Sequence, residues 1–123
     1  MTTTYVQPGE VIDWTNGTGS AVASGDVVAI GQILGVALVD IASTAVGSVQ
    51  ITGVFTVPKV SGAVILAGEA LSWDVSVAAF DDNAAVTATG DITGPPAVAF
   101  EAAGSGVTSM AVKFTGVPGT VKA

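Results

Sequence analysis

Four aspartates in the second half of the sequence, Asp74, Asp81, Asp82 and Asp91, are the residues whose type and spacing could support chemistry. Two carboxylates can share acid–base work in glycoside hydrolysis, but only when a cleft holds them at a fixed separation. The run Asp-Asp-Asn at 81–83 also offers oxygen ligands for Ca²⁺, although it lacks the alternating spacing of an EF-hand loop. Because Asp and Asn favour turns for backbone reasons, we interpret this region first as a solvated turn, second as a cation site and third as a catalytic site.

The residue types that the chain lacks exclude most other kinds of catalytic site. The chain contains no His, Cys or Arg, so the usual triads, a cysteine nucleophile and a His-ligated zinc site cannot be assembled. No glycine is followed by Lys, as a phosphate-binding loop requires, and the stretch 17–22 lacks the third glycine of a dinucleotide fingerprint. We therefore predict no catalytic, metal-binding or nucleotide-binding residues and no cofactor, and leave open whether the 81–83 turn takes a cation.

Charge limits the possible partners. Ten acidic residues against Lys59, Lys113 and Lys122 give the chain a net charge of −7. Nucleic-acid binding needs cations that displace counterions from phosphates, and an anionic membrane would repel such a chain. The longest strongly apolar run, residues 27–39, is shorter than the roughly 20 residues of a membrane helix. We expect neither a nucleic acid nor a membrane as partner, and the first ten residues show no signal-peptide pattern.

The composition favours an all-β fold, because Val and Thr suit pleated strands and the many glycines suit turns. Glycine, acid and apolar residues recur in that order at four places, as expected where a turn leads into a strand. Short strands between such corners indicate a small closed or partly open β-barrel, with a β-sandwich as the alternative. A short helical turn is expected near 61–67 and a bulge at Gly53. Strands are expected over 10–15, 26–30, 34–40, 48–59, 97–103 and 109–114.

Large side chains identify the candidate core. Residues 109–114 alternate, so this strand is expected to point three side chains inward: Met110, Val112 and Phe114. Phe55 and Phe100 are expected in the core as well, because large aromatic residues in small β domains are usually buried.

The ends of the chain differ from its middle. We expect one β domain over residues 9–116, an uncharged N-terminal arm over 1–8 and a flexible C-terminal tail over 117–123. Tyr5 and Trp14 lie near the N-terminus and are candidate anchors for a partner, since Tyr and Trp are favoured at binding hot spots. For Trp14, burial is the preferred interpretation.

Several segments resemble, in order, a family of small phage head-decoration, or capsid-cement, proteins that was formerly described as a domain of unknown function. Some of its members have carried a recombinase label, which this sequence does not support, because it lacks a phosphate loop and a basic surface. The run TGPP at 93–96 departs from the family pattern. The segments that carry the resemblance are YVQPGEVIDW (5–14), SGDVVAIGQILGVALVDIA (24–42), GVFTVPKVSG (53–62), LAGEALSWD (66–74) and the hairpin AVAFEAAGSGVTSMAVKF (97–114).

The resemblance implies a non-enzymatic structural protein that binds the outer surface of the assembled capsid and stabilises it against internal DNA pressure. It implies the phage major capsid protein as partner, a homotrimer on the capsid, and a virion location after synthesis in the host cytoplasm. The candidate capsid or subunit contacts are the uncharged arm residues and one tryptophan: Thr3, Thr4, Tyr5, Val6, Gln7, Pro8 and Trp14.

Two other functions stay open. A carbohydrate- or cell-surface-binding β module shares this composition and would need an exposed aromatic platform, for which Trp14 and Trp73 are the candidates. A catalytic role would need Asp81 or Asp82 to be strongly desolvated in a cleft.

Overall fold

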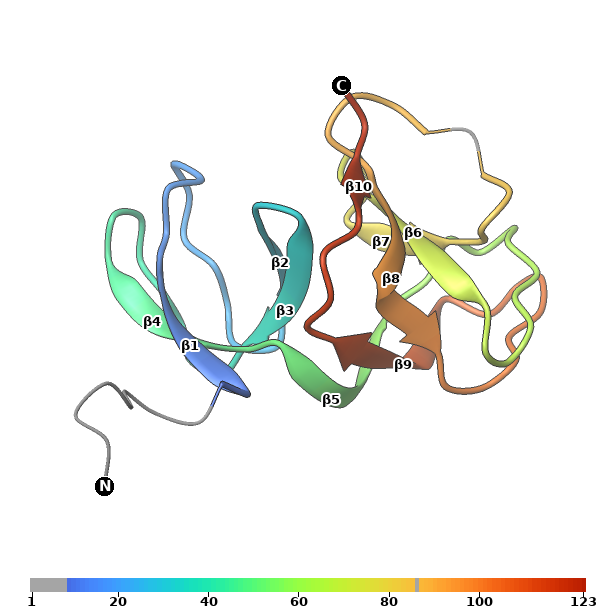
Figure 1. The fold of residues 1–123 in the computed structure, drawn as a ribbon, viewed down its shortest axis with the longest axis horizontal. Coiled ribbons are helices and arrows are strands. Elements are labelled where there is room, and N and C mark those ends of the chain that lie inside the picture. The colour runs from blue at the N-terminus through green and yellow to red at the C-terminus, as the bar shows by residue number, and fades with distance from the viewer. Residues whose placement is uncertain (1–8, 86) are drawn as a thin grey trace.

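The computed structural model describes residues 9–85 and 87–123, and in this part of the chain every regular element is a β-strand (Figure 1). The all-β class predicted from the sequence is confirmed. In chain order, the strands are β1 (Val11–Thr15), β2 (Val27–Ile30), β3 (Ile33–Ala37), β4 (Val46–Gln50), β5 (Thr52–Pro58), β6 (Ala70–Asp74), β7 (Ala79–Asp81), β8 (Ile92–Ala99), β9 (Ser109–Thr115) and β10 (Thr120–Val121).

The first sheet has four antiparallel strands in the order β1-β4-β3-β2. Its hairpin β2–β3 pairs Ile30 with Ile33, so the turn between them has two residues. Gly31 takes the first turn position with a φ of 60°, a conformation that glycine adopts without steric cost. Gly31 and Gln32, which interrupt the apolar run 27–39, therefore form a tight hairpin turn.

The second sheet has the order β5-β9-β8-β6-β7, with β10 paired to β8. Its two outer strands approach each other, because Lys59, directly after β5, forms a parallel bridge with Phe80 of β7. The Val60 N–H donates to the Phe80 carbonyl at 2.9 Å in the same contact. This bridge joins the edges β5 and β7 at one residue pair, so the second sheet is a partly closed barrel.

The chain passes from the first sheet to the second at Ile51. The sequence predicts one long or bent strand over 48–59, but the structure divides it into β4 and β5, and the Ile51 N–H donates to the Glu10 carbonyl at 2.9 Å. The predicted bulge at Gly53 is wrong, since the pairing of β5 with β9 is continuous through that residue. Gly53 instead has a φ of 124°, which reorients the backbone just after the crossing.

The core consists of two hydrophobic clusters that share β3. The larger cluster fills the second sheet and takes Leu34 and Val36 from β3, whereas the smaller cluster lies on the first sheet and includes Ala37 and Val49. Because β3 is covered on both faces, its sequence is a continuous apolar run rather than an alternating one. The inward orientation predicted for the alternating residues of β9 is confirmed, since all three are almost fully buried: Met110, Val112 and Phe114.

The helical turn predicted near 61–67 is absent, and the segment holds two β-turns instead. The Ala63 N–H donates to the Val60 carbonyl at 3.1 Å, and the Glu69 N–H to the Leu66 carbonyl at 3.2 Å. Between these turns, Ile65 pairs with Ala103 and its side chain is buried. The distant partner decides this local structure, because an extended Ile65 is needed to reach both the core and Ala103.

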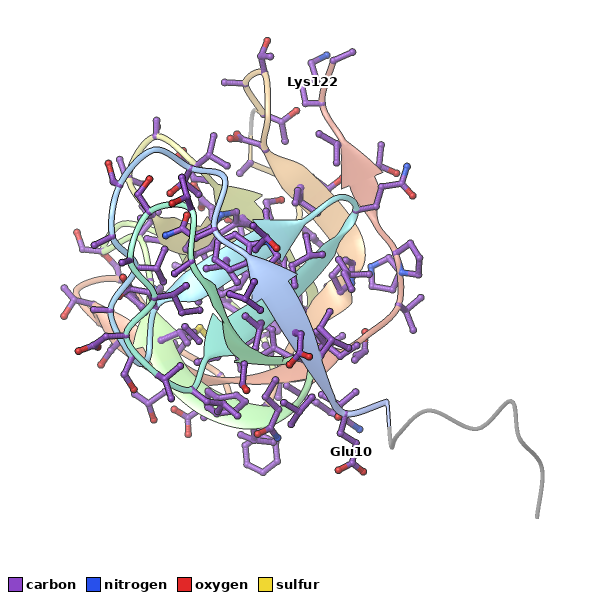
Figure 2. All side chains as sticks on the ribbon, turned by 90° about the vertical axis from the view of Figure 1, so that its left-hand side faces the viewer. Glu10 and Lys122 are labelled. Atoms are coloured by element: carbon purple, nitrogen blue, oxygen red, sulfur yellow. The ribbon has the colours of Figure 1, made fainter. Side chains whose placement is uncertain are left out.

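The C-terminal segment contains one short strand, β10. Thr120 and Val121 of β10 lie opposite Thr93 and Ile92 of β8. The Gly119 N–H donates to the Gln32 carbonyl at 2.8 Å, so this segment also connects the second sheet to the β2–β3 turn of the first. In Figure 2, Lys122, which follows β10, and Glu10, which precedes β1, lie at opposite ends of the molecule.

One buried polar side chain organises the loops of the second sheet. Lys59 is 3% exposed, and its Nζ donates to the carbonyls of Val60 at 2.8 Å, Gly104 at 3.1 Å and Val107 at 3.1 Å. An ammonium group has three N–H donors, so this geometry satisfies all of them. Lys59 therefore fixes the loop that follows β5 to the loop that precedes β9.

Asn16 has the corresponding role in the first sheet. It is fully buried, and its Nδ2 donates to the carbonyls of Ser20 and Ile41 at 2.8 and 3.0 Å. Its Oδ1 accepts from the N–H and the hydroxyl of Thr18 at 3.0 and 2.7 Å. Each sheet thus has a buried polar residue that holds its connecting loops mainly through backbone groups.

The substitution Lys59→Met is predicted to destabilise the fold strongly. It keeps the volume of the side chain but leaves three buried carbonyls without their donor, so we expect a loss of about 2–4 kcal/mol in the free energy of unfolding. Urea denaturation measures this loss. Lys113→Met is the matched control, because Lys113 is exposed on β9 and its replacement should change stability by less than about 0.5 kcal/mol. Equal effects of the two substitutions would contradict the role given to Lys59.

Candidate binding surface

The adjacent aspartates at the end of β7 serve the backbone of their own turn. The Asp81 carboxylate accepts from the Asp82 N–H at 2.8 Å, and the Asp82 carboxylate accepts from the Ala84 N–H at 3.0 Å. Both side chains are half-buried. Within 9–85 and 87–123, no three acidic side chains come close enough to form a metal-binding group. The contacts at 81–84 are those of a turn, the first of the three interpretations given above.

The other two candidate acids also bind backbone amides, at a different place. Asp91 is buried, and its carboxylate accepts from the N–H groups of Val75 at 3.2 Å and Ala88 at 2.9 Å. Asp74 accepts from the Ser76 hydroxyl at 2.6 Å and from the Ser76 N–H at 2.9 Å. The hydroxyl contact is the largest cause that lowers the pKa of the Asp74 carboxyl below its ordinary value, against a smaller opposing effect of desolvation.

A pocket of about 270 Å³ lies between the loop before β2 and the second sheet. It is slightly smaller than the 300–1,000 Å³ or so of ordinary small-molecule sites. Among its described lining residues, Asp26 carries the one ionisable side chain, and that carboxylate accepts from the Ala23 N–H at 3.0 Å. The lining offers no pair of groups for acid–base chemistry. It consists of Gly25, Asp26, Val27, Pro58, Trp73 and Ala78.

The two tryptophans do not form an exposed platform. Trp73 is buried in the larger cluster and packs on Phe80 with ring centroids 4.8 Å apart. Trp14 is half-buried against the smaller cluster, in partial agreement with the burial predicted for it. The aromatic surface that a carbohydrate-binding module needs is therefore not provided by these residues.

The prediction that Phe100 belongs to the core is wrong. Phe100 is 61% exposed, whereas Phe114 is fully buried and Phe55 packs partly buried against it, with ring centroids 5.9 Å apart. The reason is the phase of β8, in which Ala97 and Ala99 point into the core, so that the following aromatic side chain points out. The alternation of Ala97 and Ala99 in the sequence indicates this outward orientation, whereas the aromatic character of Phe100 had suggested burial.

Phe100 lies on a surface that the sequence analysis missed. The loops 59–69 and 100–108, which we call the tip, run side by side on the second sheet (Figure 1). They are joined by the Ile65–Ala103 bridge, by the Gly106 N–H donating to the Ser61 carbonyl at 2.6 Å, and by the Lys59 ammonium. Four large apolar side chains are exposed on it: Val64, Leu66, Phe100 and Val107.

The arm residues predicted as capsid or subunit contacts, Thr3 to Pro8, lie outside the described residues. Trp14, the remaining predicted contact, belongs to β1 at the outer edge of the first sheet, away from the tip. The structure thus does not bring Trp14 together with the exposed apolar residues of the tip.

A family model described as phage cement protein matches residues 6–114, which is most of the chain. The chain belongs to the phage cement protein family. Membership confirms the resemblance inferred from the ordered motifs, and it indicates a structural role associated with the phage capsid. No curated protein matches the chain. In the part of the chain that the structure describes, no helix is long and apolar enough to cross a membrane.

The substitution Ser76→Ala is predicted to raise the pKa of Asp74 towards its ordinary value of about 3.9, because the hydroxyl donor is lost. A folded-state pKa below the unfolded one stabilises the fold above the unfolded pKa, and this stabilisation is lost as the pH falls through the folded pKa. The variant should therefore be less stable than wild type at neutral pH, by less than about 1 kcal/mol. NMR titration of Asp74 gives the pKa directly, and an unchanged value would contradict the assignment.

The substitution Phe100→Ser is predicted to leave stability within about 0.5 kcal/mol of wild type, since the side chain is exposed. Phe114→Ala, by contrast, removes a fully buried ring and should cost about 3–5 kcal/mol. Thermal and urea unfolding of both variants test this contrast. A large loss for Phe100→Ser would mean that this ring is packed after all.

Proposed function

We propose that this protein binds the outer surface of the assembled phage shell and stabilises it against the internal pressure of packaged DNA. The observation that carries the proposal is the family match over residues 6–114, which spans β1 to β8 and all but the last residue of β9. The proposed direct partner is the major capsid protein, and the proposed location is the outside of the virion.

The physical properties of the chain support this role. The second sheet closes through the Lys59–Phe80 bridge, which reduces the open strand edges that would lead to edge-to-edge aggregation of copies crowded on a shell. A net charge of −7 disfavours non-specific association of these crowded copies with one another and with DNA. A cement protein needs a firm body and a binding surface, and both can be provided without an active site.

We further propose that the protein acts on the shell as a homotrimer. Three copies joined as one unit bind three shell positions with a high effective concentration, so individually weak contacts add up to firm attachment. The N-terminal arm, residues 1–8, and Trp14 at the outer edge of the first sheet are proposed to contact the shell or a neighbouring copy. Deletion of residues 2–7 tests the contribution of the arm to this binding.

Co-sedimentation with shells tests the proposed function. Expanded shells of the phage that encodes this chain, stripped of their own decoration, should bind the purified protein to saturation at a fixed ratio of about one copy per shell subunit, as trimers on three-fold positions would give. Bound shells should also resist heat disruption better than bare shells. Absence of saturable binding would refute the cement role and make a carbohydrate- or cell-surface-binding module the next candidate.

A further inference from the structure

We infer that the tip is a docking surface for the capsid shell, and that the shell contributes an apolar depression with Lys or Arg at its rim. The inference rests on the proposed function, and it names a surface of this chain that is separate from the arm and from Trp14. It starts from the four exposed apolar side chains of the tip: Val64, Leu66, Phe100 and Val107.

The backbone brings two of these side chains, Leu66 and Phe100, into one region. Ile65 and Ala103 exchange two hydrogen bonds, at 2.8 and 2.9 Å, and the Gly68 N–H donates to the Ala99 carbonyl at 2.8 Å. Segments 65–68 and 99–103 are thus antiparallel neighbours, with Leu66 within one and Phe100 within the other. Leu66 is 67% exposed, and an exposed aromatic beside exposed aliphatic side chains is typical of a binding hot spot rather than of ordinary solvent-facing surface.

The tip is ordered before any partner arrives. Lys59 binds the carbonyls of Gly104 and Val107 in one loop and of Val60 in the other. The Glu69 carboxylate accepts from the Leu66 N–H at 3.0 Å and from the Asn83 N–H at 2.8 Å, which fixes the second turn of the tip. A surface held in this way loses little conformational entropy on binding, so more of its contact energy becomes affinity.

Charge decides between the possible occupants. The tip contains three charged residues, of which Lys59 is buried, Glu69 is half-buried and engaged with backbone amides, and Glu101 is exposed. The solvent face of the tip is therefore mainly apolar, with one exposed carboxylate that accepts from the Ala111 N–H at 3.4 Å, on a chain with ten acids and three lysines. A second copy of this chain would bring mainly like charge to Glu101, whereas a shell surface with cations at its rim would complement it.

The test compares a tip variant with a control that removes the same kind of side chain elsewhere. Leu66→Ser combined with Phe100→Ser removes the apolar centre of the tip, and Val77→Ser removes a side chain that is 59% exposed between β6 and β7, outside both the tip and β1. Binding to expanded, stripped shells is measured by co-sedimentation, and folding is checked by urea denaturation. The double variant should weaken binding by about tenfold or more, and Val77→Ser by less than about threefold.

The charge part is tested by Glu101→Gln. This variant should bind shells a few-fold more weakly at low salt, and its binding should depend less on salt than that of wild type, because one screened attraction is removed. Unchanged or tighter binding would overturn the cationic rim. If Leu66→Ser destabilises the fold, Val107→Ser with Phe100→Ser is the alternative tip variant.

The remaining outcomes separate this inference from the proposed function. Wild-type protein that fails to bind shells refutes the cement role itself. Saturable wild-type binding that the folded tip variant retains overturns the tip as docking surface and leaves the cement role standing. Sedimentation equilibrium measures self-association of the free wild-type protein and of the tip variant. If the tip variant loses a self-association that wild type shows, the tip binds a second copy, which also overturns the inference.

Discussion

The ammonium group of Lys59 is the contact on which the arrangement of the second sheet depends. A buried lysine is unfavourable unless each of its N–H groups is paired, and three backbone carbonyls at 2.8–3.1 Å meet that requirement. The bridge to Phe80 lies at the same place, and its hydrogen bond is donated by the Val60 N–H. The two edges of the sheet therefore meet beside the side chain that orders both loops of the tip. Its burial leaves Lys113 and Lys122 as the exposed lysines of an acidic chain.

The sequence predicted those parts of the fold in which the local pattern and the tertiary environment agree. Alternation in β9 correctly placed Met110, Val112 and Phe114 in the core, because one face of that strand meets the core and the other meets solvent. The errors arose where a distant partner decides. Period-two alternation runs through Ile51 although the chain changes sheet there, and the pairing of Ile65 with Ala103 overrides any helical preference in 61–67. We predicted burial of Phe100 because it is aromatic, but the alternation of side chains along β8 directs it outward.

The candidate surface was harder to predict than the fold. The tip is formed by two loops more than 30 residues apart in sequence, composed mainly of small residues, and neither loop has a motif that indicates binding. Lys59 gave no signal of its own, because a lone lysine is ordinarily a solvated side chain. The family was nevertheless recognisable, and the structure gives the reason: Lys59 orders both loops of the tip, Trp73 packs on Phe80, and a side chain at Gly35 would lie 2.6 Å from Val49. Those motif residues are determinants of the fold.

The connection between the two sheets bears on the stabilisation of a shell that we propose for this protein. β3 is packed into both clusters, and Gly119 ties the C-terminal segment to the turn at Gln32, so the sheets are joined through the core and also through the backbone. β1, which follows the N-terminal arm, lies on the side of the first sheet away from the tip (Figure 1). Shell contacts at β1 and at the tip would therefore be separated by a firmly connected body. Binding at one end raises the effective concentration at the other. A body that resists bending also passes load from one shell contact to the next, which a flexible linker of the same length could not do.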